Sequence, residues 1–359
     1  MRNWERAIGV GLTLVLLVGA GACAGPAAPP ASQAAAASQP AASAAGAAAP
    51  GAAPAAPQHL KVSWSGPGSG YLPLFAAQER GFFTARNLTV EPVLTGGAQA
   101  VSALLANELD VAYPDGAALV RAALAGGDIV LLATTFNVFP FKVIANPALR
   151  QPQDLRGKRI GITRAGSTSD FAARYFLPRV GLKPDEDVAL IQIGSGPDLF
   201  SALTAGGIDA GMFGQPDGYR PTQEGYVSLY DLTSSGIEYP TAPLGVLRST
   251  VAAQPEALRG LIAGLTEGIA WVKQNRAEAL AVLARYTKID DEGALAATYD
   301  DHVPYFPRAP YPTEASIQTI LDSIRDMEPG AATARPSDFV DDRFVRELDQ
   351  SGYIARLYP

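Results

Sequence analysis

Two Pro-Asp-Gly segments place carboxylates where a small molecule could be bound. Pro114-Asp115-Gly116 and Pro216-Asp217-Gly218 each follow a short apolar run. Ligands of α/β proteins bind beyond the carboxyl ends of the strands, where a carboxylate can accept hydrogen bonds from them. Aspartate also caps helices well, so each residue could instead cap the helix that follows it. The residues alone leave both interpretations open.

A hydroxyl-rich loop offers a second group of polar atoms. Gly166-Ser167-Thr168-Ser169 follows a predicted strand at 159–162 and opens a predicted helix. The first turn of a helix has unpaired N–H groups and a partial positive charge, which suit an oxygen-bearing group. Three hydroxyls add donors without net charge. We expect this loop to hold the polar or anionic end of a ligand, with capping of its own helix by Ser167 as the alternative.

A glycine-rich loop follows the first predicted strand. Gly66-Pro67-Gly68-Ser69-Gly70 resembles the start of a nucleotide-binding loop. However, Tyr71 stands at the third glycine position of G-x-G-x-x-G, and the sequence has no G-K-[ST]. We therefore interpret the loop as exposed backbone that contacts a ligand, rather than as a dinucleotide site.

Few residues are suited to catalysis or to metal binding. The two histidines are His59 and His302, and we expect both at the surface. Cys23 is the single cysteine, so an intramolecular disulfide and a zinc site of His and Cys are both excluded. A Ser-His-Asp triad would have to recruit one of the two histidines. We expect no catalytic residue, no metal and no cofactor.

The composition indicates a large core and an acidic surface. The 359 residues are 48% hydrophobic and 18% charged, with a net charge of −7. This length is enough for two ordinary domains. Nucleic-acid binding relies on basic patches that release phosphate counterions, so the acidic balance argues against it.

The N-terminal segment is typical of an exported lipoprotein. Apolar residues 7–19 follow two arginines and lead into Ala20-Gly21-Ala22-Cys23. This pattern resembles a signal-peptide core followed by a lipobox, although Ala20 replaces the usual leucine. We predict a signal peptide at 1–22, lipidation of Cys23 and a flexible Ala/Pro/Ser-rich tether at 23–57. An ordinary cleavage site that leaves a free thiol is the alternative.

The elements that must position the polar loops alternate along the chain. Helical patterns separate apolar, strand-like runs at 59–64, 88–94, 109–112 and 129–133. This order predicts mostly parallel sheets covered by helices. Beyond Pro240 we predict a crossover strand and then helices that pack on the first lobe; the helices lie near 258–272, 277–286, 314–327 and 344.

An internal repeat relates two parts of the chain. Ser102–Asp110 and Ser201–Asp209 share S-A-L-x-A-x-x-x-D at an offset of 99 residues, and the two Pro-Asp-Gly segments recur at an offset of 102. Each copy has the order glycine-rich loop, helix, strand, loop, helix. We predict two lobes of one architecture, with a chance match in an Ala-rich chain as the alternative.

Several motifs in a fixed order resemble a bacterial family. They stand at 77–83, 87–91, 154–161, 166–167, 180–182, 187–188 and 205–210. Their order is similar to that of periplasmic solute-binding proteins for sulfonates, nitrate, taurine and thiamine pyrimidine precursors. The resemblance covers about residues 60–290 and indicates the family more strongly than the ligand.

The resemblance implies the α/β type II periplasmic-binding fold. Two lobes, each a mostly parallel sheet flanked by helices, would be joined by crossover strands and close by a hinge on a ligand in the cleft. We place the crossovers near 143–146 and 241–247, lobe one at 58–143 plus 246–359, and lobe two at 147–240.

The expected ligand contacts lie at the carboxyl ends of the predicted strands. From lobe one they are Ser65, Gly68, Tyr71, Gly97, Asp115, Thr135 and Phe136, and from lobe two they are Ser167, Thr168, Ser169 and Asp217. Tyr71, Phe136 and Phe139 could sandwich a planar ligand. Core packing is the alternative for the two phenylalanines.

The function that follows is solute capture for import. We expect a monomeric, non-enzymatic subunit, anchored outside the cytoplasmic membrane, that hands a small organic ligand to an ABC permease and ATPase. The ligand could be aromatic or heteroaromatic, or a sulfonate or carboxylate. Enzymes that resemble pyrimidine synthases or menaquinone-pathway enzymes are alternatives, the first lacking its cysteine motif here and the second fitting export poorly. A ligand-sensing subunit without a transport role also remains open.

Overall fold

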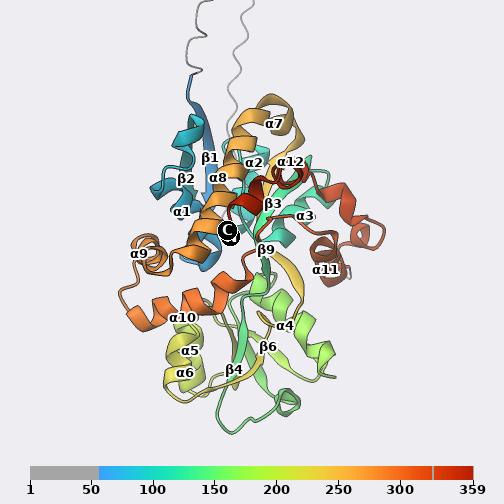
Figure 1. The fold of residues 1–359 in the computed structure, drawn as a ribbon. Helices are drawn as coiled ribbons and strands as arrows, with labels where there is room; N and C mark the ends of the chain where they lie inside the picture. Colours follow the sequence, from blue (N-terminus) through green and yellow to red (C-terminus); the bar gives the residue numbers. More distant parts are fainter. Residues whose placement is uncertain (1–55, 326, 359) are drawn as a thin grey trace, which may run out of the picture. The chain divides into compact units, whose positions relative to one another are not determined.

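A computed structural model describes residues 56–325 and 327–358. The predicted signal peptide, Cys23 and nearly all of the predicted tether lie outside the described residues. Two groups of strands organise the described part of the chain (Figure 1). We use the name lobe one for residues 56–138 and 238–358, and the name lobe two for residues 142–231.

Lobe one contains two pairs of strands. They are β1 (Gln58–Trp64), parallel to β2 (Leu88–Leu94), and β3 (Ile129–Val138), antiparallel to β9 (Glu238–Leu247). The predicted strand at 109–112 forms only isolated bridges, which join Val111 to Val62 of β1 and Ala112 to Gly245 of β9. These two residues therefore connect the parallel pair to the antiparallel pair.

Lobe two contains a five-stranded sheet in the order β6-β5-β7-β4-β8. Its strands are β4 (Lys142–Ala145), β5 (Arg159–Ile162), β6 (Ala189–Gln192), β7 (Ala210–Phe213) and β8 (Val227–Asp231). β5 is parallel to both β6 and β7, whereas β4 is antiparallel to β7 and β8. Two of the four pairings are therefore parallel, as the β-α-β-α order predicts, and two are antiparallel, so the sheet is mixed and not mostly parallel as expected.

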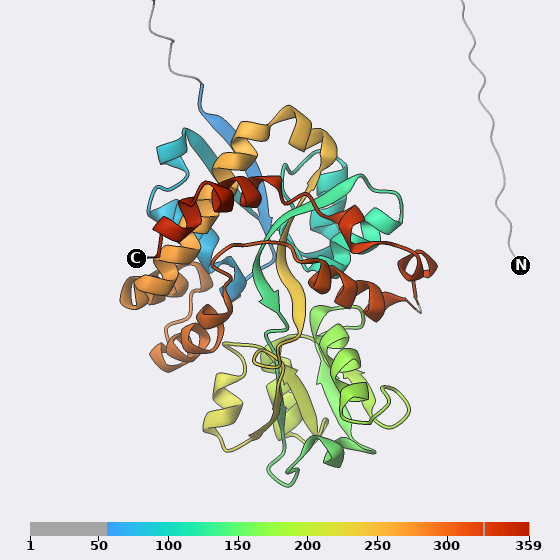
Figure 2. The ribbon, with the colours of Figure 1, turned by 45° about the vertical axis from the view of Figure 1, so that its right-hand side comes forward.

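The two crossings between the lobes differ from their predicted positions. Residues 143–145, expected in the first crossing, lie in β4 and pair with strands on both sides. Because these apolar residues are buried in the sheet of lobe two, the chain crosses earlier, between Val138 and Lys142. The return crossing lies between Asp231 and Glu238, before the long β9. Figure 2 shows β3 and β9 side by side, running down toward lobe two.

The helices surround these sheets. They are α1 (Leu72–Glu79), α2 (Gly97–Leu105), α3 (Gly116–Leu124), α4 (Thr168–Arg179), α5 (Gly196–Thr204), α6 (Tyr219–Gln223), α7 (Arg248–Ala253), α8 (Pro255–Gln274), α9 (Arg276–Thr287), α10 (Glu292–His302), α11 (Glu314–Ile324), α12 (Arg343–Gln350) and α13 (Tyr353–Arg356). The apolar stripe of α8, at the spacing of one helix face, is buried in the core of lobe one. Within the described residues, no helix combines the length and the apolar composition that a membrane crossing requires.

The internal repeat corresponds to equivalent structure in the two lobes. α2 begins at Gly97 and α5 begins 99 residues later at Gly196. The last residue of each copy has the same hydrogen bond: Asp110 accepts from the Lys61 amide at 2.8 Å, and Asp209 accepts from the Arg159 amide at 2.9 Å. Each aspartate thereby links the turn after its helix to a neighbouring strand of its own lobe.

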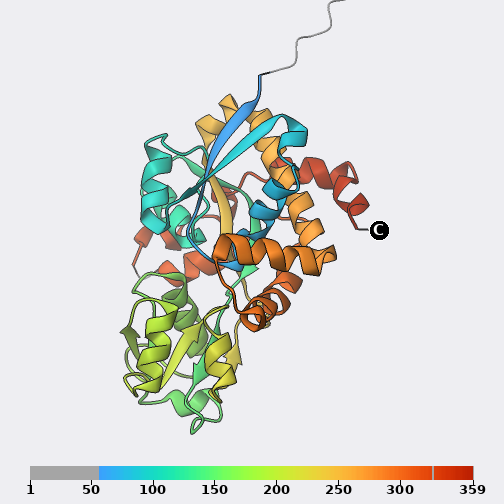
Figure 3. The ribbon, with the colours of Figure 1, turned by 90° about the vertical axis from the view of Figure 1, so that its left-hand side faces the viewer.

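Helix α10 departs from the sequence prediction. The helices predicted beyond Pro240 include none between 286 and 314 and pack on lobe one only, but His302 is the last residue of a helix. Asp301 of this helix accepts hydrogen bonds from Lys142 and Gln215, which both belong to lobe two. Figure 3 shows α8, α9 and α10 following one another along one side, so that α10 reaches lobe two. Its few apolar residues form no clear stripe, which is why the periodicity missed it.

Candidate functional site

Two cavities lie between lobe one and lobe two, and Tyr71 and Thr241 contribute to the walls of both. The smaller one, of about 220 Å³, is lined mainly by rings and apolar side chains, and we call it the aromatic cavity. The larger one, of about 1030 Å³, is lined by backbone, hydroxyls and charged side chains, and we call it the polar cavity. Since the two share walls, they are halves of one cleft.

Most of the predicted contact residues line this cleft. Ser65, Gly97, Asp115, Ser167 and Thr168 line the polar cavity, Gly68, Phe136 and Asp217 line the aromatic cavity, and Tyr71 lines both. They come from strand ends and helix starts that the fold brings together from both lobes. The rule that ligands bind at the carboxyl ends of strands therefore selected residues that are adjacent in space.

Thr135, Ser169 and Phe139 do not line either cavity. The Thr135 hydroxyl is buried, where it bonds to the hydroxyl of Tyr113 and donates to the Gly70 carbonyl at 3.0 Å. Ser169 is also buried, and it accepts a hydrogen bond from the Thr163 amide. Phe139 stacks on Tyr239 with 4.0 Å between the ring centroids. All three side chains point inward and stabilise the cleft walls from behind.

Asp115 connects the two lobes at the polar cavity. Its carboxylate accepts from the Ala117 amide at 2.9 Å, which caps α3, from the Tyr239 hydroxyl at 2.8 Å, and from Thr168 of lobe two at 2.6 Å. Burial raises the pKa of Asp115, and these three hydrogen bonds act in the opposite direction. The capping interpretation therefore holds, and the same carboxylate also bridges the cleft.

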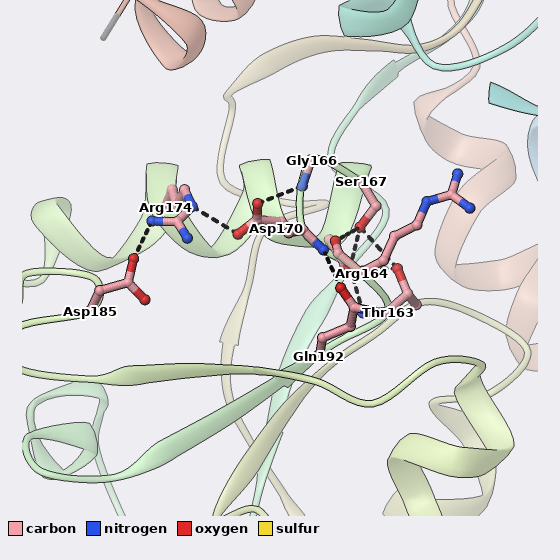
Figure 4. A network of polar contacts seen from close by, with 10 residues as sticks. Thr163, Arg164, Gly166, Ser167, Asp170, Arg174, Asp185 and Gln192 are labelled. Carbon is pink, nitrogen blue, oxygen red and sulfur yellow. Dashed lines mark hydrogen bonds and ion pairs between the residues drawn. The ribbon is translucent and has the colours of Figure 1, made fainter. Parts of the chain in front are cut away.

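The hydroxyl-rich loop is held by its own network (Figure 4). Thr163 Oγ1 lies 2.9 Å from both Ser167 Oγ and Ser169 Oγ, and the Gly166 amide donates to Asp170 at 2.8 Å. Ser167 occupies the N-cap position of α4, but its side chain makes no capping bond and donates instead to the Arg164 carbonyl. The hydroxyls expected to contact a ligand therefore already have protein partners.

Arg164 is a cleft residue that the sequence analysis missed. It lines the polar cavity, and within residues 56–325 and 327–358 its guanidinium has no hydrogen-bond or ion-pair partner. Figure 4 shows this side chain extending away from the loop network. Its Nη2 lies 3.1 Å from where a Cβ on Gly97 would stand, so it reaches lobe one across the cleft. Arg164 follows β5 by two residues, so the strand-end rule could have selected it.

Asp217 and Gln215 bring acceptors to the aromatic cavity. Asp217 is exposed at the rim and does not cap α6, whose N-cap residue is Gly218. Loss of water around the Asp217 carboxylate raises its pKa. The Gln215 side-chain nitrogen donates to Asp301 at 2.7 Å, while its oxygen is buried without a partner. Gln215 was not predicted, although it follows β7 by two residues, as Arg164 follows β5.

His302 corrects an expectation, since it is buried and lines the aromatic cavity. Its Nδ1 forms a short hydrogen bond with Ser69 Oγ. Burial lowers the pKa of His302 to about 4, so the ring is neutral at neutral pH. His59, the other histidine, is exposed as expected. Among the described residues, no three His, Cys, Asp or Glu side chains gather as a metal site requires.

The sequence profile of the NMT1-like family matches residues 53–286, which is well over half of the chain. The chain belongs to the NMT1-like family. A candidate binding protein of Brucella abortus (strain 2308) is 28% identical to this NMT1-like protein over 219 residues, which are 60% of this chain and 67% of the relative.

Solved structures share the fold of this NMT1-like protein. The periplasmic aliphatic sulphonate binding protein SsuA from Escherichia coli aligns with a TM-score of 0.64 at 18% identity, over 80% of this chain and 97% of SsuA. The periplasmic nitrate-binding protein NrtA from Synechocystis PCC 6803 aligns with a TM-score of 0.68 at 16% identity, over 86% of this chain and 92% of NrtA. The chain therefore has the periplasmic-binding fold expected from its sequence.

Proposed function

We propose that this NMT1-like protein is the extracytoplasmic solute-binding subunit of an ABC importer, and that it holds a small organic solute between its lobes. The observation that carries the proposal is the cleft, whose two cavities share Tyr71 and Thr241 and draw their walls from both lobes. A solute that contacts both walls favours the closed arrangement through those contacts. Periplasmic proteins that bind sulphonates and nitrate share the fold, which supports this function.

Polar contacts on both sides of the cleft support a hinge motion. Thr168 of lobe two meets Asp115 on the side of the polar cavity, and Gln215 of lobe two meets Asp301 beside the aromatic cavity. Each is a hydrogen bond between polar side chains that can exchange for water. Separation of the lobes therefore exposes little apolar surface at these two points, and a solute can tip the balance toward closure.

The polar cavity suits an oxygen-bearing or anionic part of the solute. Arg121 in this cavity forms an ion pair with Glu328 at 2.8 Å, whereas Arg164 is unpaired among the described residues. A guanidinium offers several donors in a planar arrangement that matches carboxylate and similar oxyanions. Arg164 is thus the cation that a sulfonate or carboxylate group would meet first.

A lipid anchor is part of the proposal and rests on the sequence before Cys23. Lipidation of that cysteine would keep the protein beside the permease and ATPase that take the solute. Replacement by Cys23→Ser should release the protein from membranes into the soluble fraction of the cell. A wild-type protein that is already soluble after fractionation would contradict the anchor.

A second candidate function, an enzyme, rests on the contact between Ser69 and His302. Both residues are buried and line the aromatic cavity, and a neutral imidazole can accept a proton from a serine hydroxyl. The neighbouring Asp301 is engaged by Lys142 and Gln215, and no carboxylate of the described residues bonds to His302. The third group that orients such a base is therefore missing, which favours binding over turnover.

The test is a thermal-shift screen of the full chain against sulfonates, aromatic carboxylates, pyrimidines, flavins and amines. A solute that binds only the folded state raises the melting temperature, since it adds about 2.7 kcal/mol of stability at a hundred times its Kd. Each solute found should titrate with one site per chain and be recovered unchanged. A screen without any binder would contradict the proposal. A product that the wild type forms and Ser69→Ala does not would establish the enzyme instead.

A further inference from the structure

The wall of the aromatic cavity contains hydrogen-bond acceptors that have no protein partner. The hydroxyls that line it bond to the protein: Tyr71 to the Tyr113 carbonyl, Thr241 to the Val138 carbonyl, Ser69 to His302, and Thr163 to Ser167 and Ser169. Among the described residues in its wall, three polar side-chain groups have no partner: the Gln215 oxygen, the Asp217 carboxylate, and Nε2 of His302, whose Nδ1 bonds to Ser69. The Gln215 oxygen and the Asp217 carboxylate are acceptors, so the group that complements these two is a donor.

The orientation of the Gln215 amide is fixed by its neighbour. Its nitrogen donates to Asp301 at 2.7 Å, and the same carboxylate oxygen accepts from Lys142 at 2.6 Å. A flipped amide would place its oxygen against that carboxylate, and two acceptors repel each other. The free atom is therefore the oxygen. An acceptor that is buried without a partner is destabilising, and a donor from a bound solute would remove that penalty.

The Asp217 carboxylate stands at the exposed rim of the aromatic cavity. A Cβ on Gly196 would stand 1.8 Å from its Oδ2, so the carboxylate lies directly against the start of α5. The partial positive charge of a helix N-terminus favours the ionised carboxylate there. Arg220, three residues along the chain, forms an ion pair with Glu224 at 2.9 Å instead. No described cation pairs with Asp217.

The remaining walls suit a cation on an apolar body. Phe136, Phe141, Phe213 and Tyr71 line the cavity, and ring faces attract an ammonium group. An apolar cavity of about 150 Å³ can hold benzene, so a cavity of about 220 Å³ has room for one ring or a short alkyl chain. This inference rests on the proposed function and deepens it. We propose that the solute carries a primary or secondary amine, and that this nitrogen binds in the aromatic cavity between Gln215 and Asp217.

The experiment is calorimetric titration of the full chain at pH 7 with three probes that share a benzyl group. Benzylamine carries a cation with N–H donors, benzyl alcohol is neutral, and benzyltrimethylammonium is a cation without N–H. We expect benzylamine to bind at least tenfold more tightly than either of the others. Binding should weaken as the pH falls, because protonation of Asp217, whose pKa is raised by desolvation, removes the charge that the amine needs, and protonation of His302 in the same wall adds a charge that repels it.

Matched variants test the two acceptors. Asp217→Asn should weaken benzylamine binding at least tenfold. Glu186→Gln removes the same charge from an exposed ion pair with Lys183, away from the cavity wall, and should leave the affinity unchanged. Gln215→Met, which keeps the volume and loses the acceptor, should weaken binding by a smaller factor. Circular dichroism of each variant confirms that it is folded.

Three results overturn the inference, and each is distinct from failure of the proposed function. Equal affinity for benzylamine and benzyl alcohol, or full affinity in Asp217→Asn, would show that no amine is recognised here. If the amine probes fail while other solutes from the screen bind, the inference is wrong and the solute-binding function stands. If no solute of any class binds the folded protein, the proposed function itself is wrong.

Discussion

The two Pro-Asp-Gly segments occupy equivalent places in the two lobes but have different roles. In lobe one the helix begins at Gly116, so Asp115 is its N-cap and bonds to the Ala117 amide. In lobe two the helix begins one residue later in the motif, at Tyr219, and Gly218 is the N-cap. Asp217 therefore has no capping bond and faces the aromatic cavity. A one-residue shift of the helix start separates a structural carboxylate from one that is available to a ligand.

The residues packed around the two aspartates also differ, which adds to the difference in their roles. A Cβ on Gly116 would stand 2.6 Å from the Pro240 carbonyl, so α3 lies directly against β9 and brings Tyr239 to Asp115. Asp217 instead lies against Gly196, a residue without a side chain. The carboxylate of Asp115 in the polar half of the cleft is therefore taken up by protein contacts, whereas the aromatic half keeps its acceptors for a ligand.

Replacement of Asp115 and of Asp217 by alanine, one at a time, should give the largest difference in unfolding free energy. Asp115→Ala removes a helix cap and leaves the hydroxyls of Tyr239 and Thr168 without their acceptor, so we expect a loss of roughly 2–4 kcal/mol in unfolding free energy. Asp217→Ala removes no bond that the described protein makes, and its effect should stay within about 0.5 kcal/mol. Urea unfolding of the ligand-free protein measures both. Equal losses would show that the two motifs have the same role.

The pH dependence of the free energy of unfolding should reflect the buried His302 in the aromatic half of the cleft. His302 is neutral in the folded protein, with its pKa lowered by burial from 6.5 to about 4. In the unfolded chain the ring gains a proton below pH 6.5, so stability should fall as the pH drops from 6.5 toward 4. One such group contributes at most about 1.4 kcal/mol per pH unit. His302→Gln should flatten this part of the profile. If the variant and the wild type lose stability equally as the pH falls, a group other than His302 causes the pH dependence.

In the polar half of the cleft we expect a smaller difference, between the effects of replacing Arg164 and of replacing Ser167 on solute affinity. For an anionic solute from the screen, Arg164→Gln should weaken binding about tenfold, which corresponds to about 1.4 kcal/mol. Ser167→Ala should leave the affinity nearly intact, because that hydroxyl bonds to Thr163 and to the Arg164 carbonyl. Calorimetric titration compares the two variants. A loss of affinity in Ser167→Ala but not in Arg164→Gln would show that the hydroxyls, and not Arg164, contact the solute.

Local pattern predicted the parts of the fold that depend on neighbours in sequence. The strand at 88–94 coincides with β2, and the repeated S-A-L-x-A-x-x-x-D marks α2 and α5 with their shared aspartate bonds. Strand ends selected Tyr71, Asp115 and Asp217 for the cleft because every parallel strand presents its carboxyl end at the same edge.

The rest of the site depends on contacts between distant parts of the chain. His302 meets Ser69 across 233 residues, and no local pattern predicts that burial. Phe136 and Phe139 have the same residue type, three positions apart, yet the first lines the aromatic cavity and the second stacks on Tyr239. The Gln215 oxygen becomes an orphaned acceptor only because Asp301 of α10 takes the amide nitrogen.

The central claim is that the two lobes close on a solute, and a distance across the cleft tests it directly. Leu94 of lobe one and Glu186 of lobe two are both exposed and can be replaced by cysteine for spin labels, in a Cys23→Ser background. Pulsed electron resonance then measures the distance distribution with and without a saturating solute from the screen. We predict a broad distribution in the free protein that becomes narrow and shorter with solute. An unchanged distribution at full occupancy would contradict closure as the mechanism of capture.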